Sequence, residues 1–212
     1  MSNLHRCFLL FFVVIGLFTL SAQDEGLYSS KAPEDKAFVR IINIGDDTAD
    51  TLPIGAVMFR GIEPGKVTPY RPISPGINIV RLGGREAELI AKKKSFYTVV
   101  LAPDSLFIIN DTRHEDSVDS QLVLYNFTEI EQIALRTSDG GTEIIPEAVK
   151  NEAASVNVNP VDVSMAVYSG QEKIADLGEK SLESGQSYSI FLIKGADEAE
   201  LLFIKAEIQT GK

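Results

Sequence analysis

The chain has 212 residues, of which 44% are hydrophobic and 24% are charged, with one cysteine, two histidines and no tryptophan. This composition is typical of a globular protein with one large or two small domains. The net charge of −10 argues against nucleic-acid binding, which needs a basic surface, and the single cysteine excludes disulfide scaffolds, cysteine-based zinc sites and iron–sulfur clusters.

Residues 1–22 have the organisation of a secretory signal peptide. A short basic segment ends at Arg6, an apolar run follows from Cys7 to Leu20, and Ser21-Ala22 supply the small residues of a cleavage site. The apolar run is shorter than the roughly 18 to 20 residues of a membrane-spanning helix, so cleavage is favoured over an uncleaved anchor. We therefore expect a periplasmic chain of net charge −11 that has no cysteine and depends on apolar burial for stability.

The remaining sequence predicts strands and turns. Segments rich in β-branched and aromatic residues are separated by Gly and Pro turns, and no window carries an apolar stripe of helical period. This pattern predicts an all-β protein with two tandem antiparallel β-sandwiches of immunoglobulin-like or jelly-roll-like type. The expected strands are residues 38–44, 77–82, 96–101, 106–109, 121–127, 161–168, 187–193 and 201–208.

Polar composition divides the chain further. We expect an N-terminal arm at 23–36, a first sandwich at 37–110, an acidic linker at 111–120 and a second sandwich at 121–212. Residues 27–110 carry a net charge of +2, whereas residues 120–212 carry −8. The asymmetry suggests that the first sandwich contacts a polyanion and the second a basic partner surface.

The two halves share an order of features that suggests duplication. The spacing is 84 residues from Phe38 to Leu122, 85 from Pro75 to Pro160 and 91 from Tyr97 to Tyr188. Two unrelated sandwiches with similar strand composition are the alternative.

Catalytic motifs are weak. Pro103-Asp-Ser-Leu106 followed by Asp111-Thr-Arg-His114 resembles the Gly-Asp-Ser block and the Asp-x-x-His spacing of SGNH-type esterases. In those enzymes the two motifs lie far apart in an α/β domain, whereas here they are adjacent in a β-rich chain with no Gly-rich oxyanion loop. After cleavage His114 is the only histidine, which excludes zinc sites built on two histidines, and Asp46 to Asp50 lack the dense oxygen spacing of a calcium loop. We expect no catalytic residue, no cofactor and no metal.

A basic cluster in the first half is the more useful feature. It consists of Arg81, Arg85, Lys92, Lys93 and Lys94. In an acidic exported protein such a patch would suit an anionic polysaccharide, which makes a carbohydrate-binding module an alternative function. The competing interpretation is a solvated hairpin whose charges are balanced by nearby glutamates.

Several ordered motifs resemble the AlgF family of periplasmic alginate biosynthesis proteins. They are Gly26-Leu-Tyr28, Ala32-Pro33, Ala37-Phe-Val-Arg40, Asn43, Leu135-Arg-Thr-Ser-Asp-Gly140, Asn159-Pro-Val161, Ala166-Val-Tyr168, Lys173-Ile174 and Asp176-Leu177. The resemblance runs from about residue 26 to residue 195 and is weakest between residues 45 and 101, which leaves the identity of the polymer open.

The resemblance implies a non-catalytic accessory protein required for O-acetylation of an exopolysaccharide. Members of the family work with a membrane O-acyltransferase and periplasmic SGNH-type acetyltransferases. On this basis Tyr28, Phe38 and Arg40 are expected to face a partner; alternatively, Tyr28 and Phe38 only pin the N-terminal arm to the first sandwich.

Overall fold

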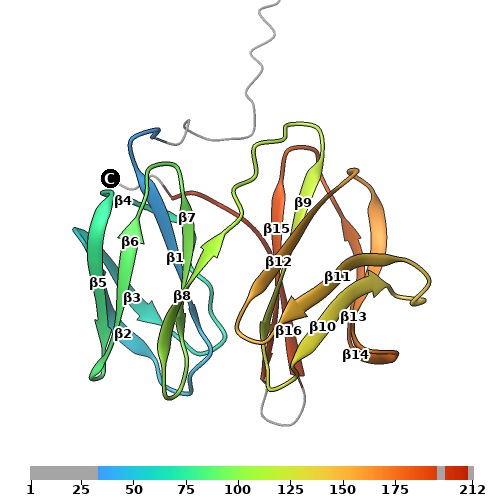
Figure 1. The fold of residues 1–212 in the computed structure, drawn as a ribbon, viewed down its shortest axis with the longest axis horizontal. Helices are drawn as coiled ribbons and strands as arrows, with labels where there is room; N and C mark the ends of the chain where they lie inside the picture. Colours follow the sequence, from blue (N-terminus) through green and yellow to red (C-terminus); the bar gives the residue numbers. More distant parts are fainter. Residues whose placement is uncertain (1–32, 195–198, 210–212) are drawn as a thin grey trace, which may run out of the picture. The chain divides into compact units, whose positions relative to one another are not determined.

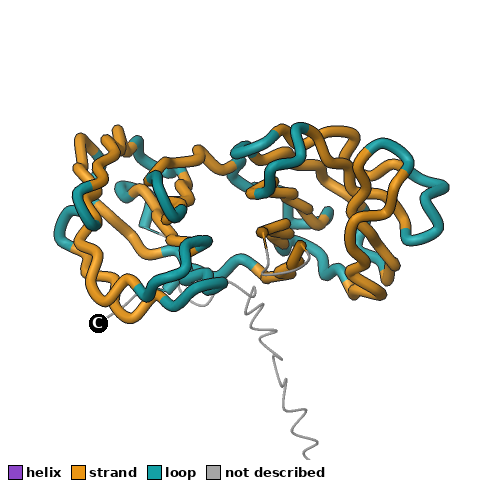
Figure 2. The backbone as a smooth tube through the Cα atoms, turned by 90° about the horizontal axis from the view of Figure 1, so that it is seen from below, coloured by secondary structure: helices purple, strands orange, loops and turns teal. Residues whose placement is uncertain are grey.

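The protein is described by a computed structural model that covers residues 33–194 and 199–209 (Figure 1). The expected signal peptide at 1–22 and the partner-facing residue Tyr28 lie outside these ranges. Figure 2 shows that the described residues form strands and loops. Across these ranges, no helix is long and apolar enough to cross a bilayer.

The first sandwich contains eight strands in two layers. One layer is a sheet in the order β4-β1-β7-β8, and the other is made of the hairpins β2-β3 and β5-β6, in which β2 lies beside β5. Their facing sides enclose a core that includes Ile41, Leu52, Val80 and Val99. The strands are β1 (Ala37–Asn43), β2 (Ala49–Ile54), β3 (Val57–Ile62), β4 (Arg71–Ile73), β5 (Gly76–Leu82), β6 (Arg85–Ala91), β7 (Phe96–Leu101) and β8 (Leu106–Asp111).

The second sandwich repeats this arrangement. Its sheets have the orders β12-β9-β15-β16 and β11-β10-β13-β14, and they enclose a second core that includes Leu124, Leu135, Val167 and Ile190. The strands are β9 (Ser120–Phe127), β10 (Gln132–Thr137), β11 (Glu143–Val149), β12 (Ala153–Val158), β13 (Asp162–Ser169), β14 (Glu172–Ser181), β15 (Ser187–Lys194) and β16 (Ala199–Lys205). Two tandem β-sandwiches, as the sequence predicts, are therefore the fold.

Equivalent side chains make equivalent hydrogen bonds in the two halves. The hydroxyl of Tyr97 accepts a hydrogen bond from the backbone N–H of Lys92 at 3.0 Å, and that of Tyr188 accepts one from the N–H of Glu183 at 3.1 Å. Both donors lie five residues before their tyrosine, at the corner that leads into β7 or β15. This repetition supports an internal duplication.

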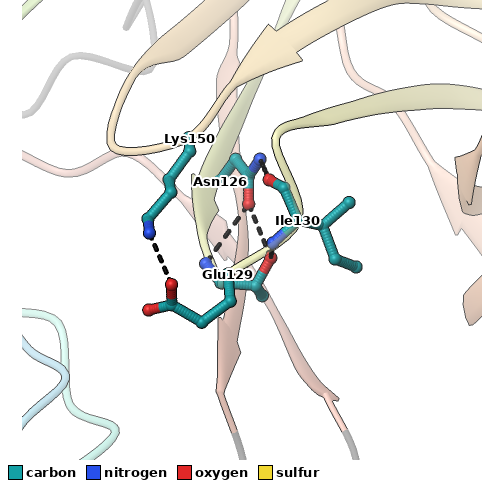
Figure 3. A network of polar contacts seen from close by, with 5 residues as sticks. Asn126, Glu129, Ile130 and Lys150 are labelled. Atoms are coloured by element: carbon teal, nitrogen blue, oxygen red, sulfur yellow. Dashed lines mark hydrogen bonds and ion pairs between the residues drawn. The ribbon is translucent and has the colours of Figure 1, made fainter.

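A buried asparagine lies at or next to the last residue of the first strand in each sandwich. Asn43 donates from Nδ2 to the carbonyls of Asp47 and Ile62, and its Oδ1 accepts from the N–H of Gly45. Asn126, 83 positions later, donates to the carbonyl of Ile130 (Figure 3) and to that of Ala148, and it accepts from the N–H of Thr128. Each asparagine thus replaces missing sheet hydrogen bonds where the chain leaves one layer for the other.

The two sandwiches meet through equivalent sheets. Each of these sheets has a parallel central pair, β1 with β7 and β9 with β15, in an otherwise antiparallel arrangement. Their outer sides form a third core, in which Ile42 and Val100 of the first sandwich join Tyr125, Phe127 and Phe191 of the second. Because both faces of β1 and β9 are covered, every residue in these two strands is buried.

Several elements differ from the sequence expectations. Strands β2, β3, β4, β6, β10, β11, β12 and β14 were not expected. Asp111 belongs to β8 and Ser120 to β9, so the connection between the sandwiches spans residues 112–119. In the expected strand 161–168, Val161 is 52% exposed, whereas the adjacent residues Ala166 and Val167 are both fully buried.

Candidate functional site

A buried polar cluster lies where the two sandwiches meet. Arg40 of β1 donates from Nε to the hydroxyl of Thr98 at 2.9 Å and from Nη2 to that of Tyr125 at 2.7 Å. The carboxylate of Asp111 accepts from Tyr70 at 2.7 Å, Thr98 at 2.6 Å and Tyr125 at 2.7 Å. The guanidinium and the carboxylate are therefore joined through hydroxyl groups, and the cluster links β1, β7 and β8 to β9.

Aromatic faces surround the guanidinium. The Cζ atom of Arg40 lies 4.5 Å from the ring centroid of Tyr70, 5.3 Å from that of Tyr125 and 5.0 Å from that of Phe191. These distances suit cation–π attraction, which is strengthened when water is excluded. Arg40 is 1% exposed, so its guanidinium is buried inside the protein.

The protonation states follow from this environment. Burial lowers the pKa of the Arg40 guanidinium, but attraction to Tyr125, Tyr70 and Asp111 outweighs burial and leaves the pKa above its ordinary value. Burial raises the pKa of Tyr70 and of Tyr125, against the opposing effect of Arg40. The arginine is therefore charged and the two tyrosines are neutral near neutral pH.

The two described residues that were expected to face a partner are internal. Phe38 is 2% exposed and stacks on Phe96 with ring centroids 4.8 Å apart, and Arg40 belongs to the buried polar cluster. Because strand β1 is covered on both faces, neither side chain is exposed to a partner in this structure. The structure places Phe38 in the packing of the first sandwich.

The basic residues of the expected polysaccharide patch separate into two groups. Lys92, Lys93 and Lys94 follow the end of β6, whereas Arg81 and Arg85 flank the turn at its beginning. The seven residues of β6 hold the groups about 20 Å apart, so the five side chains do not form one continuous patch.

The basic side chains also differ in the ion pairs and hydrogen bonds that they make. Arg81 pairs with Glu86, Lys94 pairs with Glu34 at 3.3 Å, and Arg85 donates to the backbone carbonyl of Pro103. Lys92 and Lys93 are exposed and have no ion pair within the described part of the chain. Both lysine ammonium groups are therefore free to contact an anionic ligand.

Ser105 and His114 have local roles. The carbonyl of Ser105 closes the turn after β7 by accepting from the N–H of Ala102, and Nε2 of His114 lies 3.1 Å from the carbonyl of Asp119. No hydrogen bond joins the two side chains in the described ranges. A search of the same residues finds no group of three or more His, Cys, Asp or Glu that could hold a metal ion.

The cluster partners Tyr70, Thr98, Asp111 and Tyr125 were not predicted from the sequence. Asp111 was assigned to the linker, although the residue is only 7% exposed and its carboxylate accepts three hydrogen bonds. One signal was present: Arg40 interrupts a strand that is otherwise apolar at every position from 37 to 42. A charged residue in such a strand indicates a polar partner on a second buried face.

The family model and the relatives that match this chain all belong to one family. The family model described as "Alginate O-acetyl transferase AlgF" matches residues 12–189. The alginate biosynthesis protein AlgF of Pseudomonas aeruginosa is 22% identical over 92% of this chain and 90% of its own length. That of Pseudomonas putida is 24% identical over 83% of this chain and 81% of its own length.

Solved structures of AlgF domains from P. aeruginosa also match. The C-terminal domain is 21% identical and covers 41% of this chain with a TM-score of 0.38. The N-terminal domain is 23% identical and covers 39% of this chain with a TM-score of 0.34. The family match extends over most of the sequence, and on that ground the chain belongs to the AlgF family of alginate O-acetylation proteins.

Proposed function

We propose that this protein is a non-catalytic periplasmic accessory protein for O-acetylation of alginate or a related exopolysaccharide. It acts beside a membrane O-acyltransferase and periplasmic SGNH-type acetyltransferases, and it keeps them close to the polymer. A scaffold of this kind raises the effective concentration of the reacting partners and needs no nucleophile of its own.

The observation that carries this proposal is that the Arg40–Asp111 cluster lies in the joint between the two sandwiches. Every hydroxyl in the cluster is hydrogen-bonded within it, and its strands belong to the joint between the sandwiches. A catalytic centre needs a reactive group that substrate can reach, whereas this cluster is buried. The hydrogen bonds of this cluster are therefore suited to holding the two sandwiches in a fixed relation.

A carbohydrate-binding module is the second candidate, favoured by the exposed Lys92 and Lys93. An acetyl esterase or transferase built on Ser105 and His114 is a third, and it requires a loop arrangement in which the two side chains meet. The first two candidates predict no ester hydrolysis, while the third predicts hydrolysis that His114→Ala abolishes.

The test is the acetate content of polysaccharide secreted by a deletion strain. Complementation with the wild type and with His114→Ala or Ser105→Ala is expected to restore acetate equally. Loss of acetate restoration by either variant, at equal protein level, would support a catalytic role instead. Unchanged acetate in the deletion strain itself would remove the proposed function.

A further inference from the structure

The duplication allows one sandwich to be compared with the other, loop for loop. The segments 44–48 and 127–131 follow the equivalent asparagines Asn43 and Asn126 and have equal lengths. Both are held by the same pattern of hydrogen bonds to the asparagine amide. The two loops therefore have the same backbone hydrogen bonds, and they differ in the side chains that they carry.

In the second sandwich this loop is filled by side chains. The hydroxyl of Thr128 donates to Oδ1 of Asn126 at 2.8 Å, and Ile130 packs against the second core. The equivalent positions in the first sandwich are Gly45 and Asp47. The first sandwich thus has no side chain where the second has a threonine, and an exposed carboxylate where the second has an apolar residue.

A pocket of about 180 Å³ lies at this position in the first sandwich. Asp46 and Asp47 line it from the loop after β1, and Arg85 lines it from the start of β6. Its floor includes Leu101 and Ala102 at the end of β7. The lining therefore combines two carboxylates and one guanidinium within a space that suits a single small ligand.

Arg85 is held in place by backbone carbonyls. Its Nε lies 3.3 Å from the carbonyl of Leu82, and its Nη1 donates to those of Ala102 and Pro103. Nη2 has no hydrogen-bond partner in the residues that the structure describes. A guanidinium that is fixed along one side and open on the other is prepared to bind a carboxylate, because little conformational entropy remains to be lost.

We propose that this pocket binds one hexuronate residue of the polysaccharide. The sugar carboxylate is bound by Nη2 of Arg85, and sugar hydroxyls donate to the carboxylates of Asp46 and Asp47. Alginate is a polymer of hexuronates, so the choice of ligand rests on the proposed function. The mixed charge of the lining makes recognition specific for a unit that carries both a carboxylate and hydroxyls.

The test uses the chain purified after export and an alginate-derived mannuronate tetrasaccharide as the probe. In an NMR titration, we expect amide shifts at Gly45, Asp46, Gly83 and Ala102. A neutral cello-tetraose is expected to leave them unchanged. Absence of shifts with the uronate, shifts confined to other regions, or equal shifts with both sugars would each overturn the proposal.

The double variant Gly45→Thr, Asp47→Ile gives the first loop the side chains of the second. A Cβ atom at Gly45 would lie 3.3 Å from Oδ1 of Asn43, which is a tight contact. At the equivalent position the second sandwich accommodates Thr128, whose hydroxyl donates to Oδ1 of Asn126. We expect at least a tenfold loss of affinity with an unchanged urea midpoint. The matched control is Asp50→Ile, which makes the same charge change at an exposed position of β2 outside the pocket.

Full affinity in the double variant would overturn the pocket assignment. Arg85→Gln is a second variant that keeps hydrogen-bonding capacity and removes the charge, and it is expected to lose binding as well. Failure of this proposal is distinguishable from failure of the proposed function. If the wild type restores polymer acetate but does not bind the tetrasaccharide, only the pocket is wrong; if it binds but is not needed for acetylation, only the function is wrong.

Discussion

The guanidinium of Arg40 and the hydroxyl of Tyr125 lie 85 residues apart in the chain and share a hydrogen bond of 2.7 Å between the two sandwiches. Each residue comes from the central part of a sheet whose two faces are covered. The bond gives the contact between the domains a polar centre inside an otherwise apolar core.

Replacement of Arg40 by methionine should destabilise the whole protein. The change keeps much of the side-chain volume but leaves the Asp111 carboxylate buried without a positive charge nearby. Removing one partner of a buried charge pair costs about 3 to 5 kcal/mol, so the free energy of unfolding should fall by that amount. Urea denaturation measures the change.

Arg60→Met is the matched control, because Arg60 is exposed on β3. It is expected to change the free energy of unfolding by less than about 0.5 kcal/mol. Equal effects of the two substitutions would mean that the Arg40 cluster does not stabilise the joint.

Alkaline pH should destabilise the folded state through Tyr70 and Tyr125. Burial raises the pKa of both hydroxyls in the folded protein, so above pH ~10 the unfolded chain loses these protons while the folded protein keeps them. Stability is therefore complete below pH ~10 and is lost as the pH rises toward the folded pKa values. Each tyrosine should contribute up to about 1.4 kcal/mol per pH unit in this range.

The measurement is urea denaturation at several pH values from 9 to 12, and the double variant Tyr70→Phe, Tyr125→Phe provides the comparison. We expect a shallower dependence on pH in the variant, although its stability at neutral pH is lower. Parallel profiles would contradict the assignment of the alkaline transition to these two residues.

Asn126→Ala should open the corner after β9. The substitution leaves the carbonyls of Ile130 and Ala148 and the N–H of Thr128 without their partner. Unsatisfied buried groups of this kind cost about 1 to 3 kcal/mol each, so we expect a loss of about 2 kcal/mol or more in thermal or urea unfolding. Asn157→Ala, at an exposed position of β12, should be nearly neutral.

Asn126→Asp provides a stricter comparison at the same site. The carboxylate is similar in shape but cannot donate to the two carbonyls. It should be at least as destabilising as alanine, and wild-type stability would show that the amide donor is not required.

Lys92→Glu with Lys93→Glu should weaken binding to long polyuronate chains without loss of stability. Both lysines are exposed and free of ion pairs in the described ranges, so the reversal acts through charge alone. Lys94 is left unchanged because it has a φ of 62° and pairs with Glu34. The expected effect is several-fold at low ionic strength and disappears at high salt.

Affinity electrophoresis in alginate or light scattering measures this effect. The control is Arg60→Glu with Lys66→Glu, a reversal of the same size at exposed positions away from the turn before β7. Identical behaviour of both pairs would mean that only net charge matters and that Lys92 and Lys93 form no site.

The sequence by itself determined the class of the fold and the repeated framework. Gly and Pro turns separate β-branched segments, and the spacing of 91 residues from Tyr97 to Tyr188 marks two equivalent corners. These features are local, since turn chemistry and strand composition act over a few residues. Strands such as β2 and β14 were missed because they lie at partly exposed positions, where the apolar pattern is weak.

The contacts of the covered strands could not be predicted from the sequence, because they depend on tertiary packing. The unbroken apolar run in β1 is consistent with burial on both faces, but no local pattern states that its second face meets β9 and β15. The same limit explains why Arg40 was expected to face a partner, why Asp111 was assigned to a linker, and why Arg81 and Lys92 were placed in one patch. The position of each of these residues depends on strand register or on contacts with residues that are distant in sequence. Register and distant contacts are both fixed by the packing of the whole domain.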